Sequence, residues 1–92
     1  MPRGFEMPQI CYFYGITIYI QFLDHNPPHI HAVYQSFKAQ YSIGEAKLLR
    51  GKMPNKADQL ICEWIKIRQT ELMKDWDLAK EGKPVYPVSP LE

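Results

Sequence analysis

The chain contains little cysteine. Among its 92 residues the two cysteines are Cys11 and Cys62, and no Cys-x-x-Cys sequence is present. Each lies in an apolar stretch, and the N-terminus lacks a basic segment followed by an apolar signal core. We therefore expect reduced thiols rather than a disulfide or a cysteine-based metal site.

Long hydrophobic runs and an excess of one charge are also missing. No window approaches the roughly 18 to 20 apolar residues that cross a membrane. Lys and Arg number 11 and Asp and Glu number 10, so the net charge is +1. That balance gives nucleic acid binding no support, and no membrane is expected as a partner. Together these absences favour a cytoplasmic protein.

The residues that are present form a globular composition, with 46% hydrophobic and 13% aromatic residues. At this length we expect one domain, residues 1–92, with one modest core. Its expected parts are a loose leader (1–8), a β-sheet (10–51), a helical region (54–81) and an extended proline-rich tail (83–92).

Strand-like segments fill the first half of the chain. In residues 16–22, apolar and more polar residues alternate, which is typical of a strand with one buried and one wet face. Four further segments are also rich in β-forming residues. We expect four or five antiparallel strands within residues 10–14, 16–22, 29–34, 37–43 and 47–50.

The segments on either side of Gln35-Ser36 predict a hairpin with a two-residue turn. Its apolar face pairs Ile30 with Tyr41, Ala32 with Ala39, and Tyr34 with Phe37. Its polar face pairs His29 with Ser42, His31 with Gln40, and Val33 with Lys38. In this register both histidines point away from the core.

Between residues 54 and 81, apolar residues recur at spacings of three and four, which predicts a long amphipathic helix. Trp64 and Trp76 lie on its apolar stripe and are expected to cover the sheet. The polar stretch from Arg68 interrupts the stripe, and Thr70 could cap a second helix. The sequence is therefore consistent with either one kinked helix or two short helices. The expected fold class is α+β: a curved antiparallel sheet of four to five strands, this C-terminal helix and the tail.

The tail has proline at every third position, which favours polyproline II structure. In that conformation Val85, Val88 and Leu91 share one edge, so the tail can lie along a groove. The groove could belong to its own body, to a twin subunit or to another protein, and a strap over its own sheet or helix is favoured.

All three histidines lie in the run from Asp24 to His31. Histidine titrates near neutral pH and is the commonest metal ligand, so Asp24, His25, His29 and His31 are candidate metal ligands, with zinc the best match. An extended Pro27-Pro28 unit would hold the Cα atoms of His25 and His29 about 12 Å apart. Convergence would therefore need the segment from Asp24 to turn back.

Two other interpretations apply to the same run. His29 and His31 are candidate catalytic residues that could act as general acid and base on RNA, with Lys38 neutralising phosphate. Residues 28–33 look like the opening of the histidine-triad nucleotide-hydrolase motif, but Val33 stands where the nucleophilic histidine is expected. In the third interpretation, Asp24 and the prolines fix a turn and the histidines are half-buried polar residues.

Motifs along nearly the whole chain from Met7 resemble the bacterial domain-of-unknown-function family 4160. They are Phe13–Ile16, Asp24–His31, Gly51–Pro54, Glu63-Trp64, Glu71-Leu72, Trp76 and Gly82–Pro84. The family motif carries over here as Asp24, His25, Pro27, Pro28, His29 and His31, with Gly15 and Trp64 as fold positions. The resemblance implies a small cytoplasmic protein, often encoded beside another small protein in a toxin-antitoxin-like module, with no assigned reaction.

We therefore expect an interaction component of such a two-gene module, with a small protein as partner and self-association as the alternative. It would bind through the polar face of the sheet or through an edge strand. The residues expected on the binding face are Asp24, His25, His29, His31, Tyr19, Gln21 and Gln40. No cofactor is expected, with zinc as the alternative. The alternative function is a histidine- or metal-dependent RNA-acting enzyme on the His29 and His31 face, so whether the protein is an enzyme stays open.

Overall fold

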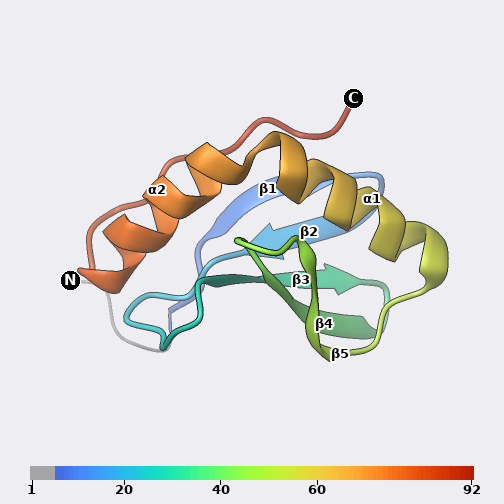
Figure 1. Ribbon diagram of the computed structural model, residues 1–92, viewed down its shortest axis with the longest axis horizontal. Helices are drawn as coiled ribbons and strands as arrows, with labels where there is room; N and C mark the ends of the chain where they lie inside the picture. The colour runs from blue at the N-terminus through green and yellow to red at the C-terminus, as the bar shows by residue number, and fades with distance from the viewer. Residues whose placement is uncertain (1–5) are drawn as a thin grey trace.

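A computed structural model describes residues 6–92; residues 1–5 of the expected leader lie outside the described residues. Within 6–92, five strands precede two helices (Figure 1). The elements are β1 (Gln9–Phe13), β2 (Ile16–Tyr19), β3 (His29–Tyr34), β4 (Phe37–Ser42), β5 (Lys47–Gly51), α1 (Asn55–Ile67) and α2 (Gln69–Lys80). The strands form an antiparallel meander in chain order. The predicted α+β class with an antiparallel sheet is therefore confirmed.

The predicted hairpin register is confirmed at every pair between β3 and β4. The β1–β2 connection is a two-residue turn in which Tyr14 and Gly15 both have positive φ, the backbone conformation that matches the twist of a hairpin. The expected strand 16–22 is shorter, because β2 ends at Tyr19. Beyond Tyr19, the chain is held by single hydrogen bonds to the carbonyls of Pro8 and Glu6.

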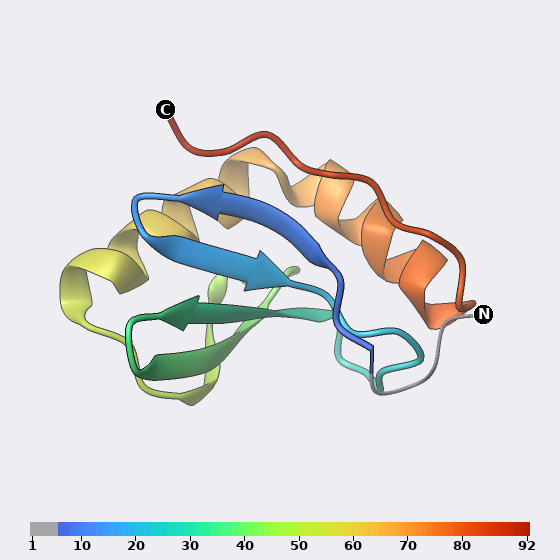
Figure 2. The same ribbon diagram turned by 180° about the vertical axis from the view of Figure 1, so that it is seen from behind.

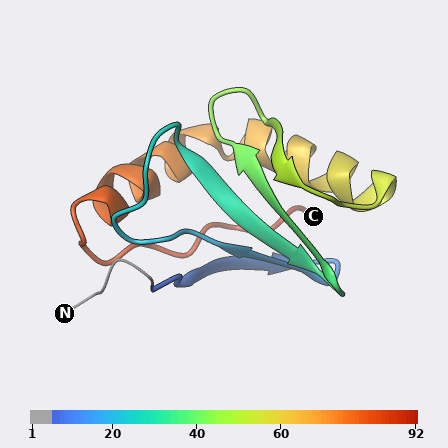
Figure 3. The same cartoon turned by 90° about the horizontal axis from the view of Figure 1, so that it is seen from below.

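Both helices lie on one side of the sheet (Figures 1 and 3). The helical region expected over 54–81 consists of two helices, which was one of the two alternatives, and a single long helix is wrong. The helical geometry is interrupted at Arg68, with φ −104° and ψ 19°. The side-chain amide of Gln69 donates to the carbonyls of Ile43 and Gly44 at 2.7 and 2.9 Å, which ties the junction to the β4–β5 turn. Thr70 lies inside α2 rather than capping it. Within residues 6–92, neither helix is long and apolar enough to cross a membrane.

The core lies between the helices and the inner face of the sheet. Trp64 and Trp76 are buried there, as the helical stripe predicted, and the ring of Trp64 lies 5.3 Å from that of Phe13. The Tyr41 hydroxyl donates to Asp58 at 2.7 Å and so links β4 to α1. Burial of the apolar side chains in this core is the main stabilising contribution to the fold.

The tail packs on its own chain, running back past α2 toward β1 (Figure 2). Val88 is 5% exposed, and its N–H donates to the Ile10 carbonyl at 2.8 Å. The indole N–H of Trp64 donates to the Ser89 carbonyl at 2.8 Å. The sequence allowed the tail to pack on its own chain, on a twin subunit or on another protein; in the structure it packs on its own chain.

Candidate functional site

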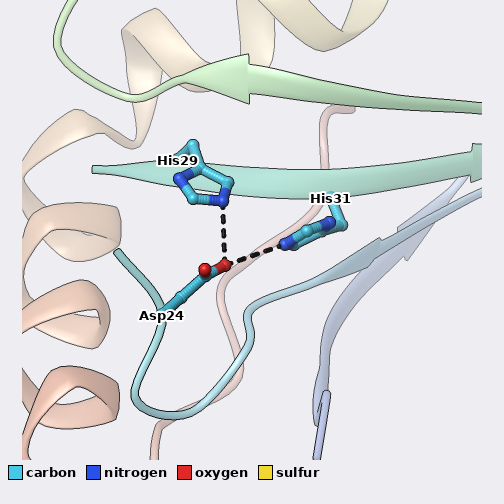
Figure 4. Close-up of side chains that lie close together, drawn as sticks. All are labelled: Asp24, His29 and His31. Atoms are coloured by element: carbon cyan, nitrogen blue, oxygen red, sulfur yellow. Dashed lines mark hydrogen bonds and ion pairs between the residues drawn. The ribbon is translucent and has the colours of Figure 1, made fainter. Parts of the chain in front are cut away.

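The loop between β2 and β3 turns back and brings Asp24 to the start of β3 (Figure 4). One carboxylate oxygen, Oδ2, lies 2.9 Å from Nε2 of His29 and 3.2 Å from Nε2 of His31. We call Asp24, His29 and His31 the Asp-His-His cluster. Their three ligand atoms lie within 4.8 Å of one another. The segment from Asp24 therefore turns back toward β3, as convergence of these side chains requires.

Backbone groups of the same loop orient the cluster. The His25 N–H donates to the other Asp24 oxygen, Oδ1, at 2.8 Å. Nδ1 of His29 lies 2.7 Å from the carbonyl oxygen of Pro27. The loop contains a cis peptide bond between Asn26 and Pro27. The ring centroids of His25 and His29 are 5.7 Å apart.

The register placed His29 correctly, but the expectation that it faces solvent is wrong. Its side chain is 2% exposed, because Asp24 approaches from the loop and the ring of Trp76 from α2 lies 5.3 Å away. The His31 side chain, two residues further on, keeps 15% exposure. His25 is 82% exposed, and its Nε2 lies 3.7 Å from Asp24 Oδ1 rather than from the oxygen that contacts His29 and His31. The two strand histidines therefore have different environments.

Burial and charge act together on the cluster. Burial alone would raise the pKa of the Asp24 carboxyl, but the His25 amide, the His31 hydrogen bond and the histidine charges outweigh it, so the net shift is downward. Burial lowers the pKa of His31, and its hydrogen bond to Asp24 opposes this shift without cancelling it. At neutral pH the pair is therefore a carboxylate beside a neutral imidazole.

The sheet face opposite the helices, which we call the outer face, carries a groove of about 620 Å³. Tyr19, His31, Gln40 and Arg50 are successive partners across β2, β3, β4 and β5, and all four line it. The other residues that line the groove are Met7, Ala32, Val33, Lys38, Ala39 and Gly51. His31 therefore belongs to both the cluster and the groove.

The structure brings together part of the binding face expected from the sequence. Tyr19, His31, Gln40 and the catalytic candidate Lys38 share the groove, whereas Gln21 lies beyond the end of β2 and outside the groove lining. Ser42, expected on the same face as His29, is buried, and its hydroxyl accepts the Glu45 N–H. Sequence reasoning did not place Arg50 on this face, because the register between β4 and β5, which pairs Arg50 with Gln40, was not predicted.

These features define a small α+β protein with a partly buried Asp-His-His cluster beside a cationic groove. The family model described as domain of unknown function, DUF4160, matches residues 15–77, and the chain belongs to this family. The match begins at the turn before β2 and includes the whole cluster. No curated protein and no solved structure matches the chain significantly.

Proposed function

We propose that this protein is the partner-binding component of a two-gene, toxin-antitoxin-like module, and that the groove on the outer face receives an acidic segment of a small protein partner. The observation that carries this proposal is the groove itself. Within residues 6–92, both helices and the tail pack elsewhere, on the inner face and along β1, and leave the groove open to a partner.

The lining of the groove supports this chemistry. Met7, Tyr19 and Val33 are at least partly exposed and provide apolar contacts, which favour association when water is displaced. Lys38 and Arg50 are exposed cations on neighbouring strands, and they can pair with carboxylates of a partner. The acidic character of the partner follows from these two charges.

The edge of the sheet extends the same surface. Among the described residues, β5 is an edge strand, and all five of its residues are exposed. Arg50 and Gly51 of β5 line the groove. A partner segment seated in the groove can therefore also approach the backbone of β5, as extended peptides do at open sheet edges.

The experiment is calorimetric titration of this protein with the product of the adjacent gene. Lys38→Glu and Arg50→Glu are each expected to weaken binding at least tenfold, because each replaces an attractive charge with a repulsive one. Lys66→Glu, the same charge change at an exposed position of α1, is the matched control and should bind as the wild type does. Absence of binding, or equal weakening by the control, would refute the proposal.

A second candidate function is RNA cleavage, and the observation that favours it is the position of His31. Its ring lines the groove beside Lys38 while Asp24 contacts Nε2, an arrangement suited to a general base near a phosphate. Because His29 is buried, only His31 of the two predicted catalytic histidines can touch a substrate.

The test of this candidate is incubation of tag-free protein with a single-stranded RNA of mixed sequence. Cleavage should be lost in His31→Ala and retained in His25→Ala, which removes an exposed histidine of the same loop. If the wild-type protein leaves the RNA intact, or if the His31 variant still cleaves it, the candidate fails.

A further inference from the structure

The strongest unexplained feature is a buried ring nitrogen of His29, Nε2, that has no hydrogen-bond partner among the described residues. Its Nδ1 lies 2.7 Å from the Pro27 carbonyl oxygen, an acceptor, so Nδ1 must carry the proton and donate it. The second ring nitrogen, Nε2, lies 2.9 Å from Asp24 Oδ2 but makes no aligned hydrogen bond within the described residues. A buried ring nitrogen and a buried carboxylate oxygen thus face each other without a hydrogen bond between them, an arrangement that a cation held between the two atoms would stabilise.

From this arrangement we infer that Asp24 Oδ2, His29 Nε2 and His31 Nε2 together bind one divalent transition-metal ion, with zinc the best match. The inference does not depend on the partner proposed above. It replaces the broad set of four sequence candidates with three defined atoms, and it leaves out His25.

The three atoms are close to the spacing that such an ion needs. Zinc binds imidazole nitrogen and carboxylate oxygen at about 2.0 to 2.2 Å, which at tetrahedral angles places neighbouring ligand atoms about 3.3 to 3.6 Å apart. The contacts from Asp24 Oδ2 to His29 and His31 are 2.9 and 3.2 Å, and all three ligand atoms lie within 4.8 Å of one another, so small side-chain shifts bring them to that spacing. Two imidazoles and one carboxylate form a borderline donor set, which favours zinc and similar ions over calcium or magnesium.

The surroundings of the ligands are those of a prepared metal site. Ligating histidines usually donate their second ring N–H to a carbonyl or carboxylate, as His29 does to Pro27. The His25 N–H fixes the Asp24 carboxylate from the other side. Nε2 of His31 is hydrogen-bonded to Asp24 Oδ2 in the structure. With an ion bound, the ring would carry its proton on Nδ1, and Nε2 would be the ligand atom. Because His31 lines the groove, a fourth coordination position can open toward solvent there.

The test uses tag-free, chelator-treated protein titrated with zinc chloride in a calorimeter. We expect saturation at one ion per chain. Asp24→Asn keeps an oxygen for the His25 amide but loses the charge, and His31→Ala removes a ligand at a half-buried position. Each should weaken zinc binding about 100-fold or more. Even substitution of a residue that only hydrogen-bonds to a metal ligand lowers metal affinity about 10- to 100-fold.

His25→Ala is the matched control, because it removes a neighbouring histidine while its backbone N–H stays in place. It should bind zinc as tightly as the wild type. If the wild type does not saturate with zinc, if both ligand variants bind normally, or if the control loses binding as they do, the three-ligand site is wrong.

His29→Gln removes a ring that is buried against Trp76 and so alters the core as well as the site. The role of His29 is therefore tested in the wild type. Nitrogen-15 NMR of the histidine rings should show zinc shifting Nε2 of His29 and His31, while Nδ1 of His29 stays protonated. Shifts confined to His25 would overturn the assignment.

Discussion

At the scale of single residues, Asp75 places a carboxylate in the protein interior. It is 2% exposed; one oxygen accepts the Tyr86 N–H at 3.0 Å, and the other has no partner among the described residues. Burial raises the pKa of Asp75, and the nearby Glu71 adds to this, while the Tyr86 amide and Lys74 oppose it. The folded state therefore holds the Asp75 proton to higher pH than the unfolded state does. As pH rises through that window, the free energy of unfolding falls.

Asp75→Asn is accordingly expected to stabilise the protein at pH 7 by about 1 kcal/mol, the scale of a buried unpaired polar group. The amide oxygen can still accept the Tyr86 N–H, and the buried charge is removed. The gain should shrink as pH falls through the raised pKa, because the wild-type carboxyl then becomes neutral. Urea unfolding at several pH values measures this. Asp77→Asn, at an exposed position of the same helix, should show no such trend.

Gly51 has a backbone requirement that other residues cannot meet. Its φ is +94°, and a Cβ atom there would lie 2.3 Å from the Lys38 carbonyl oxygen. Gly51→Ala should therefore lower the free energy of unfolding by about 2 to 3 kcal/mol, from strain and displaced backbone. Gly44→Ala is the control, since a Cβ there meets no atom of residues 6–92 within 4 Å. Chemical denaturation of both variants should separate them; equal loss would contradict the backbone argument.

The residues of the cluster were predictable only in part. Alternation along β3 placed His29 and His31 on the same side of the strand, and the run itself made Asp24 a candidate. The burial of His29 was not predictable, because it depends on Trp76, which lies 47 positions later in the chain. Local periodicity carries no information about which distant ring covers a strand end.

At the scale of elements, the tail is held by one buried side chain and several backbone contacts. Val88 is buried against the core, and its neighbours Tyr86 and Ser89 bond to Asp75 and Trp64. Val88→Ala should lower the free energy of unfolding by about 1.5 to 2.5 kcal/mol, from lost apolar burial and the cavity left behind. Thermal unfolding measures this loss. Tyr86→Ala, which removes an exposed ring but keeps the backbone N–H, should have little effect.

The elements differ in how well their limits follow from sequence. The hairpin register followed from alternation and a two-residue turn, which are local properties. The break between α1 and α2 coincides with the polar stretch at Arg68, but choosing two helices over one kinked helix requires the contacts of Gln69 with Ile43 and Gly44. Those contacts join segments 25 or more positions apart, so no helical pattern could reveal them.

At the scale of the whole molecule, the two tryptophans connect every layer. Trp64 on α1 lies against Phe13 of β1 and donates to Ser89 of the tail. Trp76 on α2 lies against His29 of β3. Sheet, helices and tail therefore share one core, and a part that detached would expose apolar surface from its neighbours. Chains of this size with one core usually unfold in a single cooperative step.

We expect such cooperativity here, and the tryptophans can report it separately. Trp76→Phe leaves Trp64 as the fluorescent probe of α1, β1 and the tail, whereas Trp64→Phe leaves Trp76 as the probe of α2 and β3. Within each variant, the urea midpoint from fluorescence should coincide with the midpoint from far-ultraviolet circular dichroism. Both substitutions remove buried ring atoms, so the variants are compared with themselves rather than with each other. An earlier fluorescence transition in the Trp64-only variant would mean that the tail and β1 separate before the sheet unfolds, contrary to a shared core.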